Sequence, residues 1–346
     1  MKTRLITSLI ILFFLVFSGT TTFGAGGYDA DGNFDASSYI MDHIADSHDW
    51  HLWDKKDGKS VSIYLPVILY SKSKGFDVFM SKKILYGNVH NGYTLKEGVV
   101  VSVDSAGNID AANKPLDLSI TKNVAALFFS CIIGLFLFIG LSRSYKKTGV
   151  SHPRGIQSFL EPVILFIRDD IAISNIGKHK YEKFMPYLLT VFFFILINNI
   201  MGLVPFPPPF GANVTGNLAV TMTLAIFTFI ITQINGNKQY WKHIFATPGV
   251  PVLLRVIMVP VEVLGMFTKP FALTIRLFAN ITAGHIIILS LVSLIFIFKS
   301  MAMAPVTILF VLFMNCLEVF VAFLQAYVFT LLSALFIGIA VEEEHH

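Results

Sequence analysis

The stretch FALTIRLFANITAGH, residues 271–285, places Arg276 between Ile275 and Leu277 within a long apolar run. This run extends from residue 252 to residue 298 and is interrupted only by scattered polar or charged residues. At about 1.5 Å per residue it would form a helix roughly 70 Å long, against a hydrocarbon core of about 30 Å in a bilayer. The segment must therefore bend, break or lie strongly tilted, and Pro260 and Pro270 are natural positions for a kink.

The composition assigns the whole chain to the membrane proteins. Hydrophobic residues make up 54% of the 346 residues, charged residues only 14%, and there are 33 phenylalanines. A soluble domain of this size is far less apolar. The net charge of +4 is too small to indicate a nucleic-acid partner.

The distribution of apolar segments predicts an all-α polytopic membrane protein with about five membrane helices. Two of them, at 252–298 and 306–341, are long enough to require tilting or bending. The predicted spans cover residues 123–141, 187–204, 218–234, 252–298 and 306–341.

The N-terminal third differs in character. Residues 1–25 have the layout of a cleavable secretory signal, with an uncleaved anchor as the alternative. Residues 26–118 are polar and carry strand-like alternation, as in KSVSIYLPVILY (residues 59–70), which predicts a small exported domain with some β structure. Residues 119–346 then form the membrane domain.

A run of histidines and aspartates lies in the predicted exported domain. In DHIADSHDWHLWD (residues 42–54), His43, His48 and His51 alternate with acids, which raises the possibility of a divalent metal site. No fixed ligand spacing supports a metal there, so a solvated acidic face is the favoured interpretation. The sequence predicts neither a metal nor a cofactor.

The basic residues set the expected topology. Lys and Arg cluster between the first two spans and again after the third, whereas the loop PFPPPFGANVTG (residues 205–216) has neither. The basic loops should be cytoplasmic. We therefore expect a bacterial inner-membrane protein with an exported N-terminal domain and a cytoplasmic C-terminus.

Arg276 is the most costly residue of the membrane domain. Arginine cannot lose its proton, so at bilayer depth it should face protein or water. It either reaches a headgroup, pairs with a structural acid, or serves a function. On a continuous helix Glu262, Lys269 and Asn280 fall within about 40° of Arg276, whereas His285 lies about 180° away.

The last long helix carries a second set of polar residues. Glu318 and Gln325 are seven residues apart and share a face, with Asn315 close by. Antiparallel packing would bring Gln325 to the level of Arg276 and Asn280, and Glu318 to His285. This pattern suggests two hydrated, titratable entrances that do not join, with a fixed positive charge between them.

These residues also carry a family resemblance. PFALTIRLFANITAGHIIIL, with VPVEVLGMFTKP before it and LEVFVAFLQAYVFTLLSALFIGIAVEEE after it, closely resembles subunit a of the F-type ATP synthases from about residue 120 onward. The resemblance implies that Arg276 is the family's invariant arginine, with Asn280 and Gln325 as its neighbours. It also implies that Glu262 lines the cytoplasmic half-channel.

Two positions depart from the best-known bacterial members. Those members carry Glu at the position of His285 and His at that of Glu318, so the pair is exchanged here, which favours proximity of the two residues. Gly202 stands where some members have an acid after Asn199. We therefore expect Asn199 and Asn315 to be supporting polar residues of a somewhat differently lined outer channel.

The resemblance implies a stator subunit that guides ions to the carboxylates of a rotating c-ring. Its implied partners are the c-ring, the subunit b peripheral stalk, the remainder of the synthase and membrane lipid. No ATP chemistry is expected of this chain, because it has no phosphate loop or other catalytic motif. The ion choice rests largely with the ring, although His285 favours protons over sodium. The alternative is an ion-coupled secondary transporter, which would show related halves; no internal repeat is found.

Overall fold

The computed structural model describes residues 35–54, 60–72, 74–96, 98–104, 108–110, 113–148, 155–204, 208–245, 251–298, 300 and 303–342. The predicted signal peptide therefore lies outside the described residues. The chain divides into two compact units. The first comprises Met1–Phe129, Met201–Val214 and Ala283–Leu317, and the second comprises Ser130–Ile200, Thr215–Thr282 and Glu318–His346.

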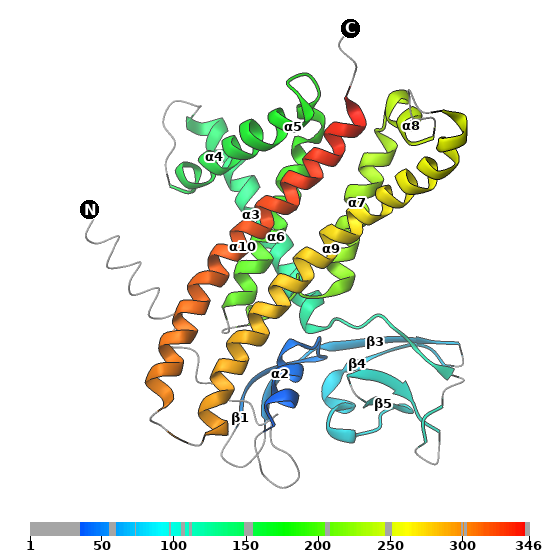
Figure 1. Cartoon of the computed structure of the whole chain (residues 1–346). Helices are drawn as coiled ribbons and strands as arrows, with labels where there is room; N and C mark the ends of the chain where they lie inside the picture. The colour runs from blue at the N-terminus through cyan, green and yellow to red at the C-terminus, as the bar shows by residue number, and fades with distance from the viewer. Residues whose placement is uncertain are drawn as a thin grey trace, which may run out of the picture. The chain divides into compact units, whose positions relative to one another are not determined.

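The described residues in the N-terminal part of the first unit form three small antiparallel sheets, with orders β1-β2, β4-β3-β7 and β5-β6. Its elements are α2 (Ala36–Ile44), β1 (Asp49–Asp54), β2 (Ser60–Tyr64), β3 (Pro66–Ser71), β4 (Gly75–Met80), the short 3-10 helices η1 (Ser81–Lys83) and η2 (Leu85–Gly87), β5 (Tyr93–Lys96), β6 (Val99–Ser102) and β7 (Leu116–Asp117) (Figure 1).

The alternation that predicted β structure is confirmed by β2 and β3. Val67 and Leu69 of β3 are fully buried, because alternate residues of a strand point to the same face. With Phe79, Ile84, Tyr93 and Val100 they form a small hydrophobic core.

A buried histidine joins two segments of this core region. Nε2 of His48 lies 3.1 Å from Oδ2 of Asp117 in β7, and His48 is only 3% exposed. Burial alone raises the pKa of the Asp117 carboxyl, but hydrogen bonds from His48 and Ser119 outweigh burial and hold the pKa below its ordinary value.

Acid should therefore weaken this part of the chain. A carboxyl whose folded pKa is depressed stabilises the fold above its unfolded pKa of about 3.8 and loses that contribution as the pH falls through the folded value. We expect the fluorescence of buried Trp50 to report this loss on acid titration. In Asp117→Asn this change in fluorescence on acid titration should vanish, and the free energy of unfolding at neutral pH should fall by about 1.5–3 kcal/mol. An unchanged acid transition in the variant would refute the assignment.

The first membrane helix, α3 (Lys122–Thr148), begins on hydrogen bonds from the preceding domain. Asp46 accepts from Oγ1 of Thr121 (2.8 Å) and from the backbone N–H of Asn123 (3.0 Å). The backbone N–H of Lys122 donates to the carbonyl of Ser47 (2.9 Å). A carboxylate at a helix N-terminus satisfies unpaired N–H groups and interacts favourably with the helix dipole.

The remaining elements are helical. They are α4 (Ile156–Phe166), the π-helix η4 (Ile167–Ile173), α5 (Ser174–Ile176), α6 (Tyr181–Leu203), α7 (Leu218–Ile234), α8 (Lys238–Phe245), α9 (Val252–Ile297) and α10 (Ala304–Val341). Figure 1 draws α9 and α10 as long coils. α9 continues through Pro260 and Pro270, so neither proline breaks it.

By length and composition, four helices of the described chain can cross a membrane: Lys122–Lys146, Tyr181–Leu203, Leu254–Ile297 and Ala304–Val341. A fifth span results if α7 and α8, which meet at a bend of 103°, count as one. The predicted fold class is confirmed: a polytopic helical membrane protein with two long helices and an N-terminal region of small sheets.

The core of the second unit is apolar and includes several small residues. Leu188 and Ile195 of α6 are fully buried, and so are Ala334 and Ile337 of α10. Gly338 of α10 lies directly against the backbone of Asn175 in α5, so close that an added Cβ would lie 2.9 Å from the Asn175 carbonyl carbon. Only a residue without a side chain allows this approach.

Candidate functional site

Arg276 lies on the open face of α9. Leu273, Leu277 and Ile281 are buried in the core, whereas Arg276 and Asn280 are exposed. The exposed positions beside them include the small residues Ala272 and Ala279. The helix therefore turns its apolar stripe into this chain and presents the arginine outward, beside residues small enough to let another helix approach.

No acid of the described chain neutralises Arg276. The salt bridges within the described residues do not include it, and it makes no hydrogen bond there. The interpretation in which it pairs with a structural acid therefore gains no support from the described residues. A permanent charge at this depth requires a partner or water on its exposed side.

Lys269 and Glu262 share the stripe of Arg276 because α9 is continuous. Nζ of Lys269 lies 5.5 Å from the ring centroid of Phe336 on α10. Oε1 of Glu262 lies 4.0 Å from Nδ1 of His243 on α8. His243 was not identified from the sequence; its only signal was its position in a short helix with Lys242, between two apolar spans.

The contact between Lys269 and Phe336 indicates how α9 and α10 are aligned. The two helices run in opposite directions, so moving eleven residues along each brings Asn280 opposite Gln325, within about one helical turn. Gln325 is only 3% exposed, and it makes no hydrogen bond with Arg276 or Asn280 in the described structure. The common level of Gln325 and Asn280 stays a prediction.

Both polar atoms of the Asn199 side-chain amide form hydrogen bonds to other segments of the chain. Its Oδ1 accepts from Oγ1 of Thr215 (2.6 Å), and its Nδ2 donates to the carbonyl of Ala322 on α10 (3.2 Å). It is 2% exposed. These bonds give Asn199 a structural role in joining α6 to α10; a part in lining a channel remains a prediction.

Replacing Asn199 with leucine should destabilise the membrane domain by about 2–3 kcal/mol, because two buried polar partners lose their bonds. Asn198→Leu is a matched control, since Asn198 is equally buried but bonds only to the carbonyl of Phe194 in its own helix (2.8 Å). Thermal unfolding of the detergent-solubilised protein should show a clearly lower midpoint for Asn199→Leu than for Asn198→Leu. Equal midpoints would contradict this role.

His285 lies next to Gly202, the position at which the sequence departs from the family pattern. A Cβ at Gly202 would lie 3.8 Å from Nε2 of His285 and 3.4 Å from the carbonyl oxygen of Ala212. A side chain at this position would therefore reach the imidazole. His285 and Asn315 belong to the first unit and Glu318 to the second, so the meeting of His285 with Glu318 remains a prediction.

The sequence model described as ATP synthase A chain matches residues 124–338. The chain belongs to the ATP synthase A chain family. The family resemblance recognised in the sequence is thereby confirmed, and with its apolar helices the chain is a multi-pass membrane protein. A second model, described as a domain of unknown function, matches residues 39–118.

Individual relatives agree with the family assignment. ATP synthase subunit a of Chloroherpeton thalassium is 52% identical over 236 residues, which cover 66% of this chain and 69% of the relative. The protein of the same name from Chlorobium phaeobacteroides is 46% identical over 284 residues, or 80% and 78% of the two chains. That of Myxococcus xanthus is 50% identical over 238 residues, or 67% and 76%.

Proposed function

We propose that this chain is the stator subunit of an F-type ATP synthase and forms two offset proton half-channels that load and unload the carboxylates of a rotating c-ring. The observation that carries the proposal is Arg276: a charge without a partner in the described chain, on an open helix face beside small residues. We assign Gln325, which is buried on the neighbouring helix, to the level of Asn280. The chain itself performs no ATP chemistry.

The proposed mechanism follows from the cost of charge in lipid. A ring carboxylate can pass through lipid once it is protonated, but not while it is ionised. Arg276 attracts the ionised carboxylate after it has released its proton. Since the guanidinium does not titrate, it also blocks direct proton flow between the half-channels.

The two half-channels would open on opposite sides of this barrier. On continuous α9, Glu262 lies about 21 Å from Arg276 in one direction and His285 about 13 Å in the other. We assign Glu262, with His243 beside it, to the cytoplasmic path. His285 and Glu318 are assigned to the outer path, with Asn315 and Asn199 in supporting positions.

Partners and orientation form part of the same proposal. The c-ring would cover the open face of α9, and the subunit b stalk would hold this chain against the remainder of the synthase. The N-terminal domain would be exported and the C-terminus cytoplasmic, in a bacterial inner membrane. The basic loops support this orientation.

The proposal is tested by disulfide trapping in the purified complex. With Cys131 and Cys316, both exposed, first replaced by serine, we expect Ala279→Cys to form a disulfide with a cysteine in the membrane helix of the ring. Ile226→Cys, on exposed α7, is the control and should not. Trapping should stop ATP-driven pumping until a reductant is added. Purification without a ring, together with solute uptake by the chain alone, would support the transporter alternative instead.

Substitutions at Gly202 test the outer path. Gly202→Ala adds only contacts of ordinary length, so pumping should stay near normal. Gly202→Leu fills the space beside His285 and should reduce ATP-driven pumping at least about tenfold, because small displacements of reacting groups are costly. The rate at which ATP acidifies the interior of liposomes containing the complex measures pumping by each variant. Normal pumping with leucine would remove His285 from the path.

A further inference from the structure

The three-stranded sheet β4-β3-β7 has one apolar face that the described chain leaves exposed. Alternate residues of a strand point to the same face of a sheet. Val67, Leu69 and Phe79 point into the small hydrophobic core, which also contains Tyr93 of β5 and Val100 of β6. The residues that alternate with them are exposed on the other side, here called the outer face: Tyr70, Phe76, Val78, Met80, Leu116 and Leu118.

The outer face is apolar throughout. Phe76 is 71% exposed and Val78 is 65% exposed. The rings of Phe76 and Tyr70 lie against each other across the two strands, with centroids 4.9 Å apart. Asp77 and Asp117, the two acids of these strands, alternate with the residues of the outer face and therefore point to the opposite side. A contiguous exposed apolar face of this kind marks a surface that binds protein or membrane.

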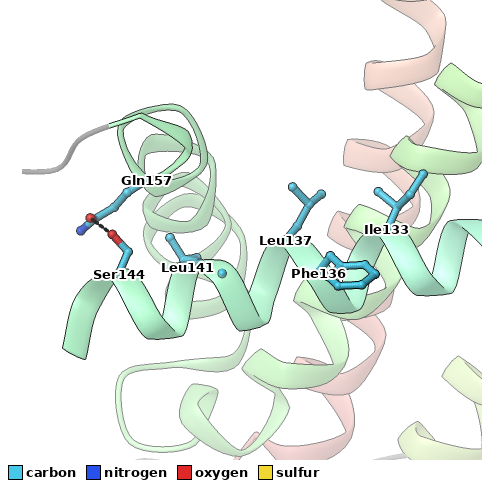
Figure 2. A pocket seen from close by; sticks show the side chains of 7 residues that line it. Ile133, Phe136, Leu137, Leu141, Ser144 and Gln157 are labelled. Carbon is cyan, nitrogen blue, oxygen red and sulfur yellow. Dashed lines mark hydrogen bonds between the residues drawn. The ribbon is translucent and has the colours of Figure 1, made fainter. Parts of the chain in front are cut away.

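The same sheet leads directly into the first candidate membrane span. After β7 the chain stays paired with β3 as far as Ile120, whose backbone N–H donates to the carbonyl of Pro66 (3.1 Å). α3 begins two residues later, at Lys122. The segment Lys122–Lys146 is apolar enough to cross a membrane, and Figure 2 shows apolar side chains in its middle part. Since Met80 pairs with Pro66, this end of the outer face lies roughly 10 Å from the start of a membrane span.

Two observations indicate that the outer face is directed toward this bilayer. The sheet and the start of α3 belong to the same unit, and Figure 1 draws β5 and the start of α3 on opposite sides of β3. Because β5 packs against the core side of the sheet, the outer face is the side toward the start of α3. Exposed lysines also lie at the strand ends: Lys72 follows β3, Lys82 follows β4 and Lys114 precedes β7. An apolar face with lysines at its margin suits an anionic lipid surface.

The size of the outer face favours lipid over another protein. Three strands about 4.8 Å apart and about five residues long cover roughly 240 Å². A stable protein–protein interface buries about 800 Å² of each partner, more than twice this area. Contact with the bilayer needs no such area, because α3 already holds the sheet beside the membrane and the docking is intramolecular.

We propose that the outer face of the sheet β4-β3-β7 docks on the lipid surface next to α3. Phe76, Val78 and Met80 reach the boundary between headgroups and acyl chains, and the lysines at the strand ends contact anionic headgroups. Docking holds the N-terminal domain against the membrane beside the first span. The proposal depends neither on the half-channels nor on which side of the membrane the domain occupies.

The docking is tested by fluorescence quenching in the purified complex, reconstituted into liposomes of phosphatidylglycerol and phosphatidylcholine. The fluorophore, nitrobenzoxadiazole, is attached to Val78→Cys in a chain whose Cys131 and Cys316 are replaced by serine. The quencher is phosphatidylcholine with a spin label near the headgroup end of one acyl chain, present in both leaflets. The matched control is Val99→Cys, at an exposed position of β6 on the other side of the core. We expect several-fold stronger quenching of Val78→Cys than of Val99→Cys.

The lysines are tested by varying the fraction of phosphatidylglycerol. Quenching of Val78→Cys should rise with this fraction. Lys72→Gln should lower the ratio of docked to undocked domain about fivefold at a given fraction, so that half-maximal quenching requires more phosphatidylglycerol. Lys96→Gln, which removes an exposed lysine of β5, is the control and should follow the unmodified chain. Quenching that ignores both phosphatidylglycerol and Lys72→Gln would refute the anionic surface.

Aqueous iodide, a water-soluble quencher, distinguishes the remaining outcomes. A fluorophore on Val78→Cys that iodide quenches but the lipid does not would show that the outer face stays in water. Protection from both quenchers would show that protein covers it. Either result overturns the proposal. Met80→Cys, on the same face, should be quenched by lipid as Val78→Cys is, and copurification of each variant with the remainder of the complex confirms that the chain is folded.

Discussion

Arg276→Ala is expected to abolish ATP-driven proton pumping by the purified complex in liposomes, with a loss of at least about a hundredfold. The variant has no fixed charge to attract the ionised ring carboxylate and no barrier between the half-channels. We also expect a passive proton leak through the membrane sector, measured as decay of an imposed pH gradient.

Lys269→Ala is the matched control for this prediction. Lys269 lies on the same stripe of α9, but its ammonium is over the Phe336 ring, so its loss should leave pumping largely intact. Arg276→Lys retains a charge but loses the planar guanidinium and its very high pKa, and should restore only part of the activity. Normal pumping by Arg276→Ala would show that the channel assignment is wrong.

Gly338→Ala should be the most destabilising single-methyl substitution in the membrane domain. The new Cβ overlaps the carbonyl of Asn175, and neither backbone can move freely. The C-terminal end of α10 is held by two further hydrogen bonds. Nζ of Lys180 donates to the carbonyl of Val341 (2.8 Å), and the backbone N–H of Asn237 donates to the carbonyl of Ala340 (2.9 Å). Overpacking of this kind lowers the free energy of unfolding by about 1–3 kcal/mol or more, and a shift of α10 would also weaken some of these hydrogen bonds.

Gly134→Ala provides the comparison. Gly134 is also helical, but its added Cβ would meet only Cδ1 of Ile197, at 4.0 Å. Alanine should therefore be neutral or slightly stabilising there. The amount of subunit in membranes and the thermal midpoint of the solubilised complex should fall for Gly338→Ala alone. Equal values for both variants would contradict the close approach of α10 to α5.

The sequence was sufficient to predict those features that depend on local properties of the chain or on the high cost of one residue type in its surroundings. The apolar runs predicted the long helices, because length and hydropathy are local properties of the chain. The alternation in residues 59–70 predicted β2 and β3 for the same reason. Arg276 was identified because charge in an apolar run is expensive wherever the helix packs.

Contacts between segments distant in the sequence could not be predicted from local patterns. Nothing near Gly338 in sequence indicates that Asn175 lies against it, and His243 has no pattern linking it to Glu262. Pro260 and Pro270 lie inside α9 without ending it, because a long helix can accommodate proline when its other bonds and packing hold, and a kink at either residue stays a prediction. The proximity of Gly202 to His285 was not predicted, because the family resemblance gave them only as two separate departures from the family pattern.

The hydrogen bonds that Asp46 makes at the start of α3 have a consequence for the boundaries of the chain. A truncation at residue 120 would keep the whole segment that matches the ATP synthase A chain family, yet it would remove the acceptors used by Thr121, Lys122 and Asn123. The first span would then begin with exposed N–H groups at its entry into the bilayer. The segment before the membrane helices therefore completes the first turn of α3, and we expect a truncated subunit that lacks Asp46 to need another N-terminal cap.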